Sequence, residues 1–264
     1  AGTAFLMWLG EKISENGIGN GISLIIFTGI IARLPSTFRG VIASVGQGGV
    51  GILSALLFVI MTLISIVAVI MITLANRRVP VQYAKRVVGR KVYGGQSTHI
   101  PLSVNQAGVI PVIFASSLLA FPATIAQFVP KLAFMADWLR GDSVSYMTVY
   151  SLLIIGFTYF YTAITFNVVD VSNNLKKYGG FVPGIRPGRP TMEYLERILS
   201  RLTFVGGLFL AIIAILPNIM TSVTKLSGVS FGGTALLIVV GVALDTMKQI
   251  EAQLLMRQYE GFMK

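Results

Sequence analysis

The sequence predicts an all-α membrane protein, a polytopic bundle of helices, and three observations support this fold class. Of the 264 residues, 54% are hydrophobic and only 12% are charged, whereas soluble domains carry about 25% charged residues. Uncharged stretches of about 20 residues, the length that crosses the hydrocarbon of a bilayer, recur along the chain. The 21 Lys and Arg residues gather between those stretches. This composition excludes an ordinary water-soluble enzyme and an intrinsically disordered chain.

Six spans are expected once loop residues are trimmed from the uncharged stretches: 18–37, 51–75, 104–128, 146–167, 202–220 and 231–250. The first is the weakest, because Arg33 and Pro35 lie close to its end. Residues 1–10 are apolar but too short to cross a membrane alone, so we expect them to end an earlier helix whose beginning is absent. Residues 17–21 predict a turn that opens the first span. A dinucleotide-binding loop is disfavoured there, because no strand precedes the glycines.

The Lys and Arg residues are divided unevenly between the two sides of these spans. Sixteen of the 21 fall on one side, and five fall on the other: Arg33, Arg39, Lys131, Arg140 and Lys225. By the positive-inside rule the richer side is cytoplasmic, and the C-terminus is expected there. Two cytoplasmic loops, 76–102 and 169–201, are longer than helix pairs need. Each carries six basic residues, and long loops with special turn chemistry are often functional.

Patterns of catalysis and metal binding are absent from the sequence. The chain has no cysteine and one histidine, His99, which we expect to cap or bond backbone in its loop rather than to catalyse. Neither an HExxH motif nor the Gly-Lys pair of a Walker A loop occurs. Asp245, with Lys248 and Glu251 at helical spacing, is expected in a solvated pair at the end of a span. We therefore predict no enzyme activity, no cofactor and no metal.

Seven motifs occur in order along the chain, and together they are family-specific. They occupy residues 2–11 (GTAFLMWLGE), 17–23 (GIGNGIS), 95–102 (GQSTHIPL), 107–111 (AGVIP), 174–177 (NLKK), 181–188 (FVPGIRPG) and 231–234 (FGGT). They closely resemble the SecY family, the central subunits of the bacterial Sec protein-translocation channel.

The resemblance implies part of a SecY-type inverted-repeat channel, since the family has ten spans in two inverted halves. Residues 1–38 would be the end of span four, a cytoplasmic turn and span five of the N-terminal half. Residues 39–264 would be the C-terminal half, spans six to ten, with cytoplasmic loops 76–102 and 169–201. The remainder of the N-terminal half, with its plug, would be missing.

The implied function is that of the channel-forming subunit of the protein translocase. Such a subunit passes unfolded secretory polypeptides across the bacterial inner (plasma) membrane and releases membrane segments laterally into it. The implied partners are SecE and SecG, the SecA motor, the ribosome with its RNA and its proteins near the exit tunnel, the secretory polypeptide, membrane lipids and the N-terminal half of SecY.

Four isoleucines match the apolar pore ring of the family: Ile22, Ile26, Ile113 and Ile238. Ile22 and Ile26 are four residues apart and so share one helix face. An apolar constriction is unfavourable for water and ions to fill, yet it forms no specific bond with a passing chain. From composition alone, isoleucines in ordinary packing or facing lipid would be the better interpretation.

Five residues match the lateral gate of the family, in the predicted span 104–128: Asn105, Gln106, Pro111, Ser116 and Ser117. We expect Pro111, in the first third of that span, to weaken the helix as a hinge. Small hydroxyls can exchange bonds with a neighbouring helix when the two separate. The alternative is that Ser and Pro signify only packing.

Five basic residues match the cytoplasmic surface that binds SecA or the ribosome: Lys85, Arg86, Arg90, Lys91 and Arg186. They would neutralise RNA phosphates with counterion release, or pair with acids of the motor. The alternative is that such charges only set topology or attract anionic lipid, and we favour that interpretation for Lys176 and Lys177. Val79-Pro80 interrupts the start of the first loop.

Two other classes of protein fit the sequence less well than a channel. A secondary transporter with an inverted repeat would need an ionisable residue near the membrane midplane, and the sequence does not supply one. A purely structural scaffold would not explain two projecting basic loops.

Overall fold

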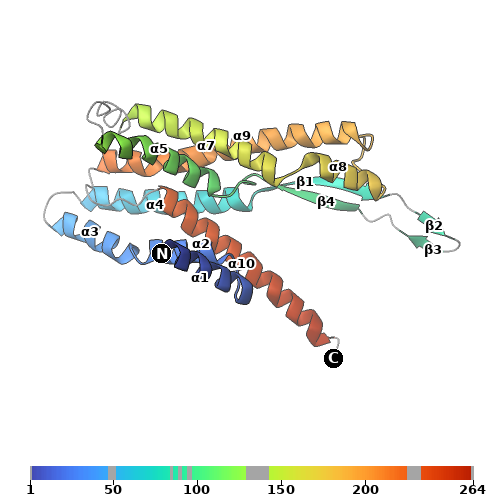
Figure 1. Cartoon of the computed structure of the whole chain (residues 1–264), viewed down its shortest axis with the longest axis horizontal. Helices are drawn as coiled ribbons and strands as arrows, with labels where there is room; N and C mark the ends of the chain where they lie inside the picture. Colours follow the sequence, from blue (N-terminus) through green and yellow to red (C-terminus); the bar gives the residue numbers. More distant parts are fainter. Residues whose placement is uncertain are drawn as a thin grey trace. The chain divides into compact units, whose positions relative to one another are not determined.

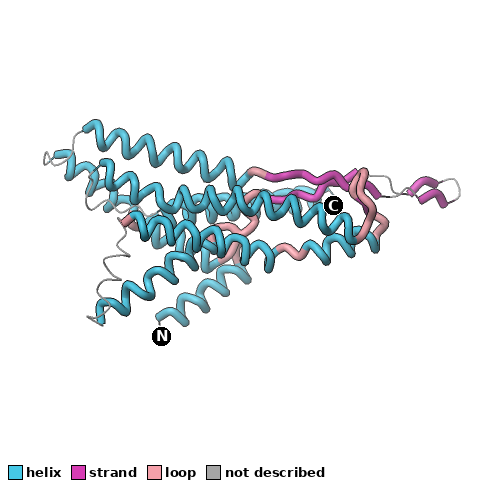
Figure 2. The backbone as a smooth tube through the Cα atoms, turned by 90° about the horizontal axis from the view of Figure 1, so that it is seen from above, coloured by secondary structure: helices cyan, strands magenta, loops and turns pink. Residues whose placement is uncertain are grey.

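The protein, described by a computed structural model over residues 2–46, 52–83, 86–88, 91–93, 97–128, 143–224 and 233–262, is predominantly helical (Figures 1 and 2). The helices are α1 (Gly2–Asn16), α2 (Gly21–Ile31), α3 (Leu34–Gly46), α4 (Ile52–Leu74), α5 (Ile110–Phe128), α7 (Val144–Thr165), α8 (Val168–Lys177), α9 (Arg189–Thr224) and α10 (Gly233–Phe262). The strands are β1 (Asn76–Tyr83), β2 (Arg86–Val88), β3 (Lys91–Tyr93), β4 (Ser97–Ser103) and β5 (Gly180–Phe181). The predicted all-α fold class is confirmed, with strands inside the two predicted loops.

Four helical segments of the described residues are long and apolar enough to cross a membrane: Gly21–Ala43, Ile52–Leu74, Val144–Lys177 and Arg189–Thr221. They correspond to four of the six predicted spans. The predicted span 231–250 lies largely within α10. The predicted span 104–128 begins later than expected, because α5 starts only at Ile110 and its apolar part, Ile110–Pro122, is shorter than a span.

The chain divides into two compact units. Unit 1 contains Ala1–Ile70, Arg140–Met147 and Ile212–Lys264, and unit 2 contains Met71–Leu139 and Thr148–Ala211. Each unit therefore joins segments that are far apart in the sequence.

The two predicted cytoplasmic loops meet in unit 2, in one antiparallel sheet with the order β4-β1-β5. β1 pairs with β4 from Asn76↔Ser103 to Gln82↔Ser97, and with β5 at Gln82↔Phe181 and Tyr83↔Gly180. Pro80 fits this central strand because β5 pairs only beyond it, which leaves that edge of β1 open at Pro80.

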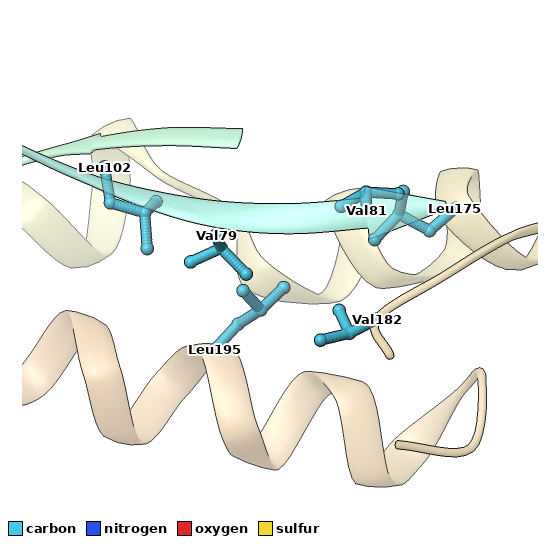
Figure 3. Packing of buried hydrophobic residues seen from close by; sticks show 6 residues of the cluster. All are labelled: Val79, Val81, Leu102, Leu175, Val182 and Leu195. Atoms are coloured by element: carbon cyan, nitrogen blue, oxygen red, sulfur yellow. The ribbon is translucent and has the colours of Figure 1, made fainter. Parts of the chain in front are cut away.

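The sheet has a hydrophobic core of its own. Alternate residues of β1 point inward, and six buried side chains from both loops pack together (Figure 3): Val79, Val81, Leu102, Leu175, Val182 and Leu195. They come from β1, β4, α8, the segment after β5 and the first turns of α9. We call this body, residues 76–83, 97–103 and 168–202, the sheet platform. One core therefore unites both loops, as expected of two loops predicted on the same side of a membrane.

Unit 1 packs its first helices by close backbone approach. Asn20 caps α2 by accepting hydrogen bonds from Ile22 N (3.1 Å) and Ser23 N (3.2 Å). Gly21 lies against the carbonyl of Gly10 in α1, where a side chain would not fit. The predicted turn at residues 17–21 is thus confirmed, with Gly19 at φ 91°.

A groove of about 240 Å³ opens between α3, α4 and α10 of unit 1. Its lining is almost entirely apolar: Leu34, Thr37, Phe38, Val41, Phe58, Val59, Thr62, Leu63, Ile66, Leu236, Val239 and Val240.

Candidate functional site

The platform presents Arg186 on a turn that is anchored on both sides. The guanidinium side chain is exposed, whereas the neighbouring Ile185 packs against the platform core. Gly184 (φ 82°) and Gly188 (φ 103°) adopt the left-handed conformation that glycine tolerates. The Pro-Gly-rich run therefore forms the special turn that the sequence predicts.

Two buried hydroxyls hold the backbone of this turn. Thr191 Oγ1 donates to the carbonyl of Arg186 (2.8 Å), and Ser172 Oγ of α8 donates to the carbonyl of Gly188 (2.9 Å). Thr191 and Ser172 are both almost fully buried. Because these bonds are shielded from water, they fix the position from which Arg186 projects.

Two of the other four predicted partner contacts, Arg86 and Lys91, lie in a small hairpin. Arg86 pairs with Tyr93, and Lys91 with Val88, in the two-stranded sheet of β2 and β3. The structure describes the backbone of Arg86 and Lys91, while Lys85 and Arg90 lie outside the described residues. A contact role for these four stays a prediction.

The predicted gate segment is divided between a turn and a helix. Asn105 and Gln106 lie in the turn between β4 and α5, not in the span expected to contain them. Pro111 is buried and is the second residue of α5, so it lies at the start of the helix, and its role as a hinge stays a prediction. Proline near a helix start costs no internal hydrogen bond. The proline inside α5 is Pro122.

The two predicted gate serines bond to their own helix. Ser116 Oγ and Ser117 Oγ both donate to the carbonyl of Ile113, at 2.9 and 2.8 Å. Such bonds satisfy the hydroxyls within the helix and can bend it slightly. They also attach both predicted gate serines to the backbone of a predicted pore-ring residue.

The predicted pore ring draws on both units. Ile22 and Ile26 of α2 are 45% and 41% exposed, Ile113 of α5 is 37% exposed, and Ile238 of α10 is partly buried. Ile113 belongs to unit 2 and the other three belong to unit 1, so their convergence on one passage stays a prediction. None of the four side chains is fully buried in the core of its own unit.

Two minor expectations differ from the structure. His99 lies exposed on strand β4, opposite Pro80, and not in a loop. Asp245 is exposed as expected, but the ion pairs found among the described side chains are Lys12–Glu15 and Arg189–Glu193, so its expected pair with Lys248 is wrong. Among those residues no group of His, Cys, Asp and Glu could hold a metal ion.

The sequence patterns did not predict the strands in both loops. They also did not predict the close contact between Gly206 of α9 and the carbonyl of Val104. Alternation of Val79 and Val81 with exposed neighbours was the available signal for β1. For Gly206 the only signal was a Gly-Gly pair inside an apolar helix, which does not say what approaches it.

Comparison with known proteins gives consistent matches along the whole chain. The SecY family model matches residues 1–247. The protein translocase subunit SecY of Halalkalibacterium halodurans is 54% identical over 275 residues, covering 100% of this chain and 64% of the relative. That of Thermotoga maritima is 47% identical over 264 residues, covering 100% of this chain and 60% of the relative. The chain thus spans less than two thirds of the length of these relatives.

Two solved structures share the fold. One concerns the plug domain of a SecY protein (TM-score 0.60, 19% identity), and the other a protein-conducting channel (TM-score 0.61, 20% identity). Each match covers 95% of this chain, and 64% and 63% of the respective solved chains. At such identities the likeness concerns the fold alone.

Proposed function

The chain belongs to the SecY family, and we propose on that basis that it forms the C-terminal part of a protein-conducting channel in the bacterial inner (plasma) membrane. The observation that carries the proposal is the family match over residues 1–247. The chain is a membrane protein, with four helices long and apolar enough to span. Its substrate would be an unfolded secretory polypeptide, and its membrane segments would leave sideways into lipid.

The passage would be lined at its narrowest point by Ile22, Ile26, Ile113 and Ile238. Their partial exposure supports this role, because a ring residue must keep a surface free for the passing chain. Isoleucine side chains resist wetting and so oppose ion flow, but they accept any sequence because they form no hydrogen bonds. No catalytic step is required, so we propose a channel and not an enzyme.

Energy for movement would come from a partner at the sheet platform. Arg186, exposed on a turn that two buried hydroxyls hold, is suited to pair with acidic side chains of a SecA-type motor or with ribosomal RNA phosphates. A pre-positioned arginine loses less entropy on binding than a mobile one. The platform would face the cytoplasm, since its loops are the most basic of the chain, and the C-terminus would lie on that side.

Partner subunits of the SecE and SecG kind would pack against the membrane helices. The groove of unit 1 between α3, α4 and α10 supports such a partner, because its apolar lining suits a hydrophobic helix in lipid.

A cross-linking experiment tests the proposed passage. The chain has no cysteine, so single cysteines at Ile26, Ile113 and Ile238 can be introduced without removing others. A secretory polypeptide stalled during export should cross-link to all three positions in the assembled translocase. The matched control is Ile64→Cys, an exposed isoleucine of α4 outside the predicted ring.

Cross-links at the three ring positions but not at residue 64 would support the channel. Absence of cross-links at all three, with the protein assembled and the substrate stalled, would refute it. An alternative function as a secondary transporter would instead predict uptake of a small solute and no contact with polypeptide.

A further inference from the structure

Gly206 of α9 is a point where two backbones meet. The residue is buried, and a methyl group added to its Cα would overlap the carbonyl oxygen of Val104 and lie 3.3 Å from that carbonyl's carbon. The obstruction is backbone, so it cannot be relieved by rotating a side chain. Only glycine lets the segment after β4 rest directly on α9 at this position.

Val104 is also held from its other side. Its N–H donates to the carbonyl of Ala75, between α4 and β1, at 3.0 Å. The residue is therefore fixed by a hydrogen bond at its nitrogen and by contact with α9 at its carbonyl. The turn that starts here is consequently anchored before it continues to α5.

The anchored turn leads into α5 within a few residues. Ala107 is buried, and Gly108 reverses the chain with φ 64°. Pro111 and Val112 at the start of α5 are buried as well. Ile113 follows directly, and its carbonyl accepts the bonds of both predicted gate serines. A displacement of Val104 would thus be transmitted to the first turn of α5.

The adjacent Gly207 makes a different contact. A methyl group there would lie 3.5 Å from Ile155 Cα and 3.5 Å from Thr158 Cβ of α7. These are ordinary van der Waals separations, so alanine fits without displacement. The two glycines are both buried and both helical, but only Gly206 has a backbone atom in the way.

We propose that Gly206 is a positioning residue for α5. Its missing side chain lets the backbone of Val104 pack directly on α9, and this contact sets the position of Ile113, Ser116 and Ser117. The consequence for the channel rests on the function proposed above. If α5 carries part of the pore ring and the lateral gate, then a side chain at residue 206 displaces α5 and loosens the closed state.

The test compares Gly206→Ala with Gly207→Ala in the assembled translocase. Spin labels on Leu118→Cys of α5 and Leu208→Cys of α9, both exposed and in unit 2, report the distance between the helices. We expect the mean distance to shift in Gly206→Ala and to stay at the wild-type value in Gly207→Ala. We also expect a several-fold rise in resting ion conductance in Gly206→Ala alone.

An unchanged distance in Gly206→Ala, or equal shifts in both variants, would refute the claim that the contact between Gly206 and Val104 positions α5. A shifted distance with unchanged conductance would overturn the link between the position of α5 and the closed state. Failure of the wild type to cross-link to polypeptide would refute the channel itself, whatever the distances show. If Gly206→Ala does not accumulate, the yields of the two variants decide: loss of Gly206→Ala alone supports the contact, because only residue 206 has a backbone atom in the way, and equal loss of Gly207→Ala overturns it.

Discussion

The two units differ in how their hydrophobic clusters are built. In unit 2, six side chains of the platform are buried together, and Val81, Leu102 and Leu195 are wholly inaccessible. In unit 1, the cluster between α3 and α4 has one buried member, Val41, with Ala55 and Phe58 packed against it. Both clusters are apolar, but only the first resembles the interior of a soluble domain.

The difference follows from the solvent that each region meets. The platform joins the strands to the charged ends of two of the helices that can span, α8 with Lys176 and Lys177 and the start of α9 with Arg189 and Glu193, so water drives its apolar side chains together. α3 and α4 lie in candidate spans, where lipid tails are as apolar as the side chains and leave little force to bury them. Burial of a whole cluster therefore accompanies the platform, and apolar exposure accompanies α3 and α4, although helix packing also buries Ile154 and Leu210 within candidate spans.

The largest expected effect is at the platform core. Val81→Asp places a carboxylate where no water reaches, which costs several kcal/mol. We expect the platform to unfold locally while the spanning helices stay inserted. Limited proteolysis should then cut within residues 76–103, and the yield of membrane-inserted protein should be unchanged.

The matched control is Gln82→Asp, since Gln82 is the next residue of β1 and is exposed. It carries the same new charge and should leave the protease pattern as in the wild type. Equal cleavage of both variants would mean that the platform has no core of its own. The difference between the buried cluster of unit 2 and the exposed cluster of unit 1 would then be refuted.

The second effect concerns the surface of the platform and not its core. Arg186→Glu reverses an exposed charge, so folding should be unaffected, but translocation should fall by about tenfold or more if a charged partner binds there. Export rate and subunit assembly are measured together. Lys177→Glu, the same charge reversal at an exposed residue of α8, should leave export near wild type, since Lys177 is not among the predicted partner contacts.

Unchanged export in Arg186→Glu would remove this residue from the partner surface. Equal loss in both variants would mean that the overall charge of the platform matters and that the anchored turn does not.

The spans were predictable because hydrocarbon imposes length and the absence of charge. The predicted span 51–75 agrees with Ile52–Leu74 to within a residue at each end. The predicted span 104–128 started too early, because residues 104–109 are uncharged but form a turn. Hydropathy cannot distinguish an apolar turn from a helix. Gly108 and Pro111, a reversal and a helix start, were the local signals of the true boundary.

The candidate site was predictable only where local chemistry dictates structure. The Pro-Gly-rich run around Arg186 indicated a special turn, and the turn is present. The hydroxyls that hold it, Ser172 and Thr191, come from two other elements and carry no local signal. The contact of Gly206 with Val104 carries no local signal either. It depends on which backbone segment packs against α9, and only the tertiary fold determines that.

The smallest expected effect tests the same contrast at helix starts. Asn20 caps α2 in unit 1, and Asn167 caps α8 in unit 2 by accepting from Val169 N (3.1 Å) and Asp170 N (3.3 Å). Replacing either by alanine should cost about 1 kcal/mol, or about fivefold faster amide exchange in the first turn. Asn→Asp at each position keeps an accepting oxygen and should restore the wild-type rate. Because water can replace the lost bond at α8, the loss there should be no larger than at α2. A clearly larger loss at α8 would mean that the platform depends on its caps more than on its buried core.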